Sequence, residues 1–322
     1  MHAVGVDIGG TKIAAGVVDD DGTIVAKARR DTSAGDADGI NAAIAEVVAE
    51  FAGDYEFDAI GLAAAGFASS DREHIVFGPN IAAWRDYPLA AKVRELVERD
   101  VSVVVENDAN AAGWAEFVYG AGRGTSTMVM VTLGTGLGAG MVVDGRLVRG
   151  AYGFAAELGH MRVVPDGYLC GCGHRGCWEQ YASGSALVRE AKLEVAASPE
   201  RAAAILAKTK DGDPAKIKGP YVTAAAMEGD PLAVSLLAEL GSWLGEGCAA
   251  VAAVLDPEVF VVGGGVIAAG ELLLESARDA YARALPAGGH RPVAPIVAAD
   301  MGNDAGIVGA AALARLDAAR AR

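Results

Sequence analysis

Three cysteines lie within eight positions, in the segment Cys170-Gly-Cys172-Gly-His-Arg-Gly-Cys177. An odd cluster cannot pair off completely into disulfides, and a reducing cytosol keeps such thiols free. Cysteines at this spacing with interleaved glycines are typical of a metal loop, because glycine lets the backbone fold tightly around an ion. Zinc takes four nitrogen or sulfur ligands, so a histidine should complete the set. His160, ten positions before Cys170, and His174, inside the loop, are the candidates.

Carboxylates flank this cysteine loop on both sides. Glu157-Leu-Gly-His160 precedes it, and Glu179 follows directly after Cys177-Trp. Carboxylates accept hydrogen bonds, often two at once, which suits a ligand rich in hydroxyl groups. If His160 binds a metal through one ring nitrogen, the other nitrogen is free to contact such a ligand.

A second polar segment, Glu106-Asn107-Asp108-Ala-Asn110, comes straight after the apolar run Val101–Val105. A carboxylate at the carboxyl end of a buried strand faces the crevice where open α/β sheets bind ligands. Asp108 can there act as a general base toward an attacking hydroxyl, and Asn107 can hydrogen-bond a neighbouring hydroxyl. The alternative is a helix N-cap, in which Asp or Asn only begins the next helix.

Glycine turns supply candidate phosphate sites. Asp7-Ile-Gly9-Gly10-Thr11-Lys12 follows an apolar strand, and its N–H groups and the Thr11 hydroxyl can approach a phosphate closely. It matches neither the Walker A pattern nor GxGxxG, so a plain hairpin is the alternative. Gly134-Thr135-Gly136 is a second such turn. The triple glycine Gly263-Gly264-Gly265 either lets a base or ribose lie against the backbone or only turns a strand into a helix.

The elements around these turns repeat. Strands are predicted at 3–8, 13–18 and 23–28, and again at 128–133, 137–143 and 146–149. One fixed offset along the chain aligns the two sets of strands. With this offset, Gly10-Thr11 aligns with Gly134-Thr135, and Ala15-Gly16 aligns with Ala139-Gly140. Self-similarity at roughly domain length predicts a duplicated fold.

Helices alternate with further strands, which is typical of an α/β protein. Besides the repeated strands, apolar runs predict strands at 59–64, 101–105 and 259–262. Apolar spacing predicts helices, listed in chain order, at 40–51, 89–99, 185–197, 199–208, 221–228, 231–255, 270–285 and 306–316.

Composition bounds the class of protein. The chain has 322 residues, enough for about two domains, and is 52% hydrophobic and 21% charged. Its net charge of −15 argues against a nucleic-acid partner. No apolar run approaches the ~20 residues of a membrane helix, and no signal peptide is recognised, so we expect a cytoplasmic protein with no membrane partner.

Taken together and in this order, the motifs resemble a known family. Asp7-x-Gly-Gly-Thr-Lys12, Glu106-Asn-Asp108-Ala-Asn110, Leu133-Gly-Thr-Gly-x-Gly138, Glu157-x-Gly-His160 and the loop from Cys170 to Glu179 strongly resemble the ROK (repressor, open reading frame, kinase) family. The likeness runs over nearly the whole chain and is closest to the ATP-dependent glucokinases of the actinobacterial type.

The resemblance implies a role for each matching position. Asp108 would be the base that activates the sugar 6-hydroxyl, and Asp7 would organise the Mg²⁺ on the ATP phosphates. His160 with Cys170, Cys172 and Cys177 would hold a structural Zn²⁺. The implied sugar ligands are Gly66, Asn80, Asn107, Asp108, Glu157, His160 and Glu179. The implied nucleotide contacts are Asp7, Gly9, Gly10, Thr11, Lys12, Gly134, Thr135, Gly263, Gly264 and Gly265.

The resemblance also implies a fold and partners. The fold would be the duplicated ribonuclease H-like α/β fold of actin and hexokinase, with a cleft between two lobes. We predict a smaller lobe at 1–117 plus 306–322 and a larger one at 118–305 that carries the zinc loop. Glucose and ATP would be the substrates, and the protein would be a homo-oligomer, a dimer or tetramer.

Several alternatives compete with a glucokinase activity. A kinase for fructose, mannose or N-acetylmannosamine would use the same motifs, and polyphosphate is an alternative phosphoryl donor. A chaperone- or actin-type ATPase would have no use for Glu157, Glu179 and the cysteine loop. A sugar-sensing repressor of the same family is disfavoured, because no room for a DNA-binding domain precedes Gly9.

Overall fold

The computed structural model describes residues 2–32, 35–79, 81–97 and 99–321. The chain divides into two compact units, each made of separate stretches of sequence. Unit 1 comprises Met1–Ser126, Gly140–Ala156 and Asp300–Arg322, and unit 2 comprises Thr127–Ala139 and Glu157–Ala299. The lobe boundaries predicted above, 1–117 plus 306–322 and 118–305, stay a prediction.

A mixed sheet forms the centre of unit 1, in the order β3-β2-β1-β4-β8. Its strands are β1 (His2–Ile8), β2 (Lys12–Val18), β3 (Ile24–Asp31), β4 (Phe57–Ala64) and β8 (Ser102–Asn107). The first three form an antiparallel meander, whereas β1, β4 and β8 run parallel. The parallel arrangement brings the carboxyl ends of β1, β4 and β8 to one edge, where Gly9-Gly10-Thr11, Ala65-Gly66 and Asp108 follow the three strands.

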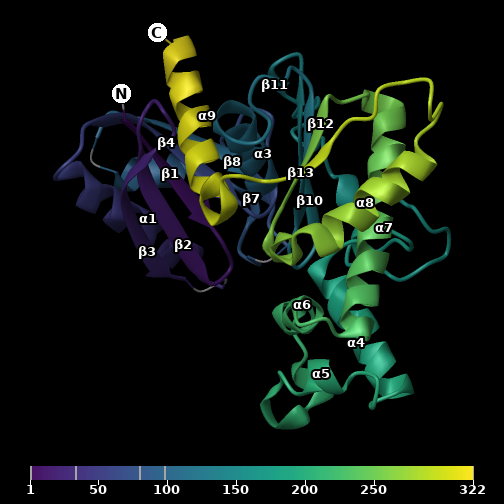
Figure 1. Cartoon of the computed structure of the whole chain (residues 1–322). Helices are drawn as coiled ribbons and strands as arrows, with labels where there is room; N and C mark the ends of the chain where they lie inside the picture. The colour runs from purple at the N-terminus through teal and green to yellow at the C-terminus, as the bar shows by residue number, and fades with distance from the viewer. Residues whose placement is uncertain (1, 33–34, 80, 98, 322) are drawn as a thin grey trace. The chain divides into compact units, whose positions relative to one another are not determined.

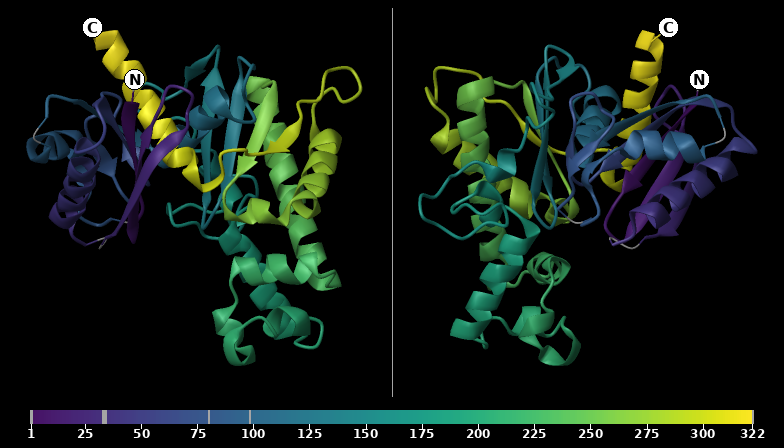
Figure 2. Two further views of the ribbon diagram at one scale, coloured as in Figure 1. Left: turned by 60° about the vertical axis from the view of Figure 1, so that its left-hand side comes forward. Right: turned by 180° about the vertical axis from the view of Figure 1, so that it is seen from behind.

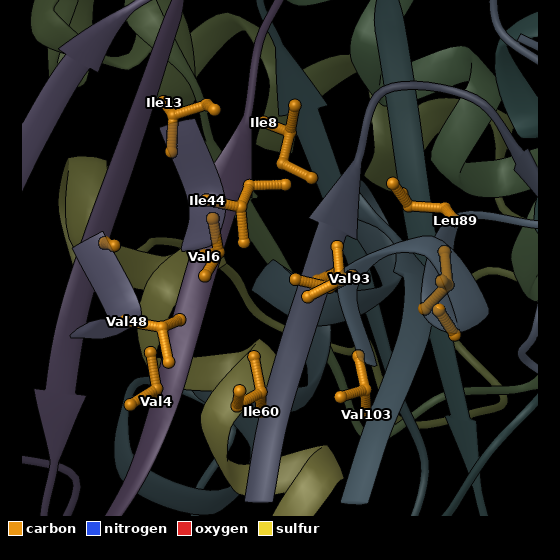
Figure 3. Close-up of a cluster of buried hydrophobic side chains, with 14 of the residues drawn as sticks. Val4, Val6, Ile8, Ile13, Ile44, Val48, Ile60, Leu89, Val93 and Val103 are labelled. Atoms are coloured by element: carbon orange, nitrogen blue, oxygen red, sulfur yellow. The ribbon is translucent and has the colours of Figure 1, made fainter. Parts of the chain in front are cut away.

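One face of this sheet carries the hydrophobic core of unit 1. Alternate residues of β1 point toward α1 (Ala37–Ala52) and α2 (Leu89–Leu96), as the period of two in a strand requires. Figure 3 shows Val4, Val6 and Ile8 of β1 in this cluster with side chains from both helices. The side chains of these three β1 residues are fully buried.

The other face of the sheet packs at backbone distance against the C-terminal helix α9 (Ala305–Ala321), which in turn packs against α3 (Asp108–Tyr119). A Cβ at Gly5 would lie 1.9 Å from the Ile307 carbonyl oxygen, and one at Gly61 would lie 1.9 Å from that of Ala310. Only glycine allows such an approach. Figure 1 and both views of Figure 2 show the yellow C-terminal helix lying along the purple strands of unit 1.

A smaller antiparallel sheet, β5-β6-β7, completes unit 1. Its strands are β5 (Phe67–Ala68), β6 (Ile75–Phe77) and β7 (Arg85–Tyr87). The 150–155 loop sits on it: Gly153 has φ +92°, and a Cβ there would meet the Ala68 carbonyl oxygen at 2.3 Å. The ring of Phe154 packs edge-on against that of Phe67.

The second large sheet has the order β11-β10-β9-β12-β13. Its strands are β9 (Met128–Leu133), β10 (Leu137–Val143), β11 (Arg146–Leu147), β12 (Val259–Gly263) and β13 (Ile296–Ala298), and the boundary between the units falls within β10. If the five strands of each large sheet are numbered by their order in the chain, both sheets have the same spatial order: third, second, first, fourth, fifth. This repeated topology confirms the predicted duplicated α/β fold.

Unit 2 also carries a set of α-helices. They are α4 (Gly184–Ala197), α5 (Ala203–Leu206), α6 (Gly219–Met227), α7 (Pro231–Leu255) and α8 (Glu271–Ala284). The long α7 packs along α8. The helix predicted at 199–208 is wrong in extent, since only residues 203–206 are α-helical. Within the described residues, no helix is both long and apolar enough to cross a membrane.

Candidate active site and metal centre

The turn after β8 places the predicted catalytic carboxylate at a helix N-terminus. Asn107 is the N-cap of α3, and its side-chain oxygen accepts the Asn110 N–H at 3.0 Å. Its amide donates to the Gly66 carbonyl at 3.1 Å. Asp108 is therefore the first residue of the helix, and its carboxylate accepts the Ala109 N–H at 2.9 Å. The N-cap interpretation holds for Asn107, which leaves a chemical role open to Asp108.

Gly66 is the second element of this turn region. A Cβ at this position would lie 2.7 Å from the Phe77 carbonyl oxygen, so a larger residue would displace β6. The structure thus brings Gly66, Asn107 and Asp108 together at the carboxyl edge of the unit 1 sheet. Asn80, predicted to join them, lies outside the described residues.

The first glycine turn joins β1 to β2 at the same edge of the sheet. The Gly9 N–H donates to the Lys12 carbonyl at 2.9 Å, which closes the hairpin. Thr11 and Lys12 are exposed, and Asp7 is half-buried at the carboxyl end of β1. Within the described residues the Asp7 carboxylate accepts no hydrogen bond. Burial raises its pKa, and the positive charge of Lys12 only partly offsets that effect.

Asp7→Asn is expected to stabilise the substrate-free protein at neutral pH. A folded-state pKa above the unfolded value means that ionised Asp7 costs stability, and this cost disappears once the carboxyl is protonated in both states. The gain in Tm should therefore be full at pH 7 to 8 and vanish as the pH falls through the folded pKa toward ~3.9, the usual value for Asp. Thermal unfolding from pH 4 to 8 measures it, with Asp21→Asn at an exposed turn as the control. A gain in Tm that is independent of pH would contradict the assignment.

In unit 2 the cysteine loop and one histidine form a compact ligand set. Ligand atoms of His160, Cys170, Cys172 and Cys177 all lie within 4.8 Å of one another. Cys170 Sγ is 3.7 Å from His160 Nδ1, and Cys172 Sγ is 3.6 Å from Cys177 Sγ. Ligands 2.0–2.3 Å from a tetrahedral zinc lie about 3.3–3.8 Å apart, so these separations fit zinc. His174 is not in this set; its carbonyl accepts the Cys170 N–H.

Glycines and a buried tryptophan hold the loop in place. Gly176 has φ +78°, and a Cβ there would lie 1.6 Å from the Val164 carbonyl oxygen. Trp178, fully buried, donates from Nε1 to the Trp243 carbonyl at 2.8 Å and packs on Gly247 of α7. The chain between Cys177 and Glu179 is therefore anchored to the longest helix of unit 2.

The predicted sugar carboxylates lie beside this ligand set. Glu157 Oε2 is 4.0 Å from His160 Nε2, and Cys170 Sγ donates to Glu179 Oε1 at 2.9 Å. Burial raises the pKa of Glu157, the electrostatic effect of the neighbouring His160 opposes that shift, and the negative charge of Glu179 adds to it. A Cβ at Gly159 would lie 2.2 Å from the Leu137 carbonyl oxygen, which explains the glycine in Glu-x-Gly-His. Two carboxylates and a ring nitrogen are thus gathered within unit 2.

The second glycine turn lies against this group. A Cβ at Gly136 would come within 2.7 Å of Glu179 Oε2. The Gly134 N–H donates to the Gly136 carbonyl at 3.0 Å, and the Gly134 carbonyl accepts the Gly184 N–H at 2.8 Å. The Gly134 N–H is therefore already engaged within the turn, so the Thr135 hydroxyl is the more suitable phosphate donor here.

A cavity of about 470 Å³ opens beside that turn, wholly within unit 2. Gly264 has φ +86° and passes against the Leu133 backbone, whereas a Cβ at Gly265 would meet nothing within 4 Å. The lining residues are Leu133, Gly134, Thr135, Gly184, Ser185, Leu187, Val188, Ile217, Lys218, Gly219, Pro220, Thr223, Gly265 and Val266. Residues 217–223 were not identified from the sequence as part of a site, because the start of a helix without a motif carries no chemical signature.

Known proteins resemble this chain over nearly its full length. The chain matches the ROK family over residues 3–316. It is 50% identical over 312 residues to a glucokinase of Streptomyces coelicolor, with 97% of both chains covered. It is 32% identical over 310 residues to an N-acetylmannosamine kinase of Yersinia pseudotuberculosis, covering 96% of this chain and 97% of that one.

A solved structure extends the likeness to three dimensions. The ROK family glucokinase from Streptomyces griseus, crystallised in complex with glucose and AMPPNP, is 49% identical and superimposes with a TM-score of 0.88. The match covers 98% of this chain and 100% of that one. Sequence motifs, topology and full-length similarity agree, and the chain belongs to the ROK family.

Proposed function

We propose that this protein is a glucokinase, which transfers the γ-phosphate of ATP to the 6-hydroxyl of glucose. The observation that carries this proposal is the near full-length likeness to a ROK glucokinase solved with glucose and an ATP analogue. The likeness to an N-acetylmannosamine kinase is weaker, at 32% identity, so glucose is the favoured sugar.

Asp108 is the proposed general base. Phosphoryl transfer depends chiefly on positioning and on stabilising charge, so the protein must orient the sugar hydroxyl and accept its proton. Asp108 stands at the N-terminus of α3 with its neighbour Asn107 fixed as the N-cap, so its carboxylate is held by a rigid element. The proposed sugar ligands are Gly66, Asn80, Asn107, Glu157, His160 and Glu179.

The cavity of unit 2 supports a nucleoside triphosphate as the donor. Its lining is mainly apolar, with Leu187, Val188 and Pro220 among the residues that face it, and an apolar wall suits a flat base. Polyphosphate has no apolar part that such a wall would bind. The proposed phosphate contacts are Gly9, Gly10, Thr11, Lys12, Gly134 and Thr135, and Gly263, Gly264 and Gly265 are proposed to lie against the adenosine.

Two metals are proposed. Asp7 would help to hold the Mg²⁺ that neutralises the ATP phosphates, and a half-buried carboxylate that accepts no hydrogen bond among the described residues suits an oxygen-seeking cation. His160, Cys170, Cys172 and Cys177 would hold one structural Zn²⁺, which supplies rigidity to the loop. The dimer or tetramer and the cytoplasmic location stay predictions.

A coupled phosphorylation assay tests the proposal. Glucose, fructose, mannose and N-acetylmannosamine are each offered with ATP and with polyphosphate. We expect the highest kcat/KM for the pair of glucose and ATP. A higher kcat/KM for another sugar would reassign the substrate, and a higher kcat/KM with polyphosphate would reassign the donor.

A further inference from the structure

Glu106 is a buried carboxylate that the proposed reaction does not use. It lies at the end of β8, directly before Asn107 and Asp108, and is only 2% exposed. Burying an ionised carboxylate is costly unless it is paired and hydrogen-bonded. Its contacts therefore indicate what the chain gains from placing a charge there.

One carboxylate oxygen of Glu106 holds the turn that carries the proposed base. Oε1 accepts the Asn107 N–H at 3.2 Å and the Asn110 side-chain N–H at 3.1 Å. The N-cap bond from the Asn110 N–H to Asn107 spans the same residues. Asp108 therefore lies inside a turn that is fixed at both ends by Glu106 and Asn107.

The other oxygen faces two guanidinium groups. Oε2 is 2.7 Å from Arg149 Nε and 2.6 Å from Arg149 Nη2, and Arg72 Nε lies 3.6 Å away. Arg72 is itself buried and also pairs with Asp317 of α9. Charge-assisted contacts of this kind are strong and directional, so they restrict how the Glu106 carboxylate can rotate.

Arg149 connects this carboxylate to a second part of the proposed site. Its carbonyl accepts the Ala155 N–H at 3.0 Å, which closes the 149–155 loop on the small sheet beside Phe67. That loop runs into Glu157, a proposed sugar ligand, and Phe67 directly follows Gly66, another. Glu106 thus lies between the turn of Asp108 and the segment that leads to Glu157.

We propose that Glu106, acting with Arg149, is a positioning residue for phosphoryl transfer. It fixes the 107–110 turn relative to the 149–155 loop, so that the Asp108 carboxylate is held where it can take the proton of the sugar hydroxyl. This inference rests on the proposed function, because it assumes that Asp108 is the base. Small displacements of a catalytic group can lower the rate by about 100-fold, so such a positioning role has a measurable effect.

The test compares Glu106→Gln with Asp317→Asn. Each substitution removes one negative charge from the partners of Arg72, but only the first touches the 107–110 turn. Per mole of folded protein, we expect Glu106→Gln to lower kcat by about 10- to 100-fold while the KM for ATP changes less than about twofold. Asp317→Asn should leave kcat within about twofold of the wild type, whatever its effect on Tm. A kcat for Glu106→Gln within twofold of the wild type, or an equal loss in Asp317→Asn, would overturn the inference.

Arg149 offers a graded second series in case Glu106→Gln folds poorly. Arg149→Lys keeps a positive charge beside Glu106, whereas Arg149→Gln removes it, so kcat should fall in the order wild type, Arg149→Lys, Arg149→Gln. Equal kcat in the two variants and the wild type would also count against the inference.

Hydrogen exchange separates this inference from the proposed function. In the substrate-free protein, Glu106→Gln should speed amide exchange in peptides covering 107–112 and 149–156, whereas Asp317→Asn should not. If the wild type phosphorylates no sugar, the proposed function fails, and the exchange data still report whether Glu106 holds both segments. Unchanged exchange in Glu106→Gln would refute that role even in an active kinase.

Discussion

Asp108→Asn is expected to lower kcat for glucose phosphorylation by about 100- to 10,000-fold, the range that general-base catalysis contributes. Asparagine has almost the same shape as aspartate but cannot accept the hydroxyl proton. Its side-chain oxygen can still accept the Ala109 N–H, which Asp108 bonds at 2.9 Å, so the start of α3 should be retained. Glucose affinity should therefore change far less than kcat.

The effect of Asp108→Asn on the stability of the fold can be measured separately from its effect on kcat. A negative charge in the first turn of a helix stabilises it by about 0.3–1 kcal/mol, and Asp108→Asn removes that interaction from α3. Asp38, in the first turn of α1, is the matched position, so Asp38→Asn should lower Tm by a similar amount with kcat unchanged. The measurements are kcat in the coupled assay, glucose binding by calorimetry, and Tm. A kcat for Asp108→Asn within tenfold of the wild type would contradict the assignment of Asp108 as the general base.

The duplicated fold was predictable because its signal lies in turn residues. Glycine and threonine at the end of a strand have few structural substitutes, so Gly10-Thr11 and Gly134-Thr135 remain recognisable where the apolar strand residues do not. The structure places both pairs between the first and second strands of equivalent sheets. Helix extents were less predictable, and residues 199–208 show why: an apolar pattern does not fix how far a short helix propagates.

The cluster of possible metal ligands was largely predictable for a different reason. Its three cysteines are close in sequence, and short glycine-rich turns leave few ways to arrange them. The choice between His160 and His174 was not decidable from spacing. The pairing of Arg162 with Cys177 brings the segment after His160 alongside the end of the loop, whereas His174 sits at the turn between Leu169 and Arg175. Long-range strand pairing of this kind has no local signature.

The contacts of Glu106 could not be predicted at all. Arg72, Arg149 and Asp317 are scattered across the sequence, and each alone reads as an ordinary surface charge. They meet only because β8, the 149–155 segment and α9 pack in one unit. The sequence indicates which residues have suitable chemistry, but tertiary packing decides which of them are held rigidly.

The second large effect is expected on loss of the metal. The wild type should contain about one zinc per chain, and Cys172→Ser should lose it, because a serine hydroxyl is a poor zinc ligand. Cys172 is exposed, so its replacement sacrifices little packing. His174→Gln is the matched control, since His174 lies in the same loop but outside the ligand set, and it should keep the metal. Elemental analysis of the three proteins measures the zinc content.

Loss of the metal should lower both stability and sugar affinity. Removing a structural metal is among the changes that cost more than about 4 kcal/mol, so Tm should fall clearly in Cys172→Ser and not in His174→Gln. Because His160 is one of the four ligands and Glu157 and Glu179 lie beside them, kcat/KM for glucose should fall by at least about tenfold, chiefly through KM. A metal-free Cys172→Ser protein with wild-type activity would contradict the zinc assignment.

Metal exchange distinguishes a structural from a chemical role for the zinc. A fourth protein ligand closes a tetrahedral site, which leaves no open position for water or substrate. His160, Cys170, Cys172 and Cys177 supply four ligands, so the ion should only fix the loop. Replacing zinc with Co²⁺ or Cd²⁺, which also accept thiolate ligands, should then restore Tm and kcat/KM together. A metal that restored Tm but left kcat low would show that the ion takes part in the chemistry, and the structural assignment would be wrong.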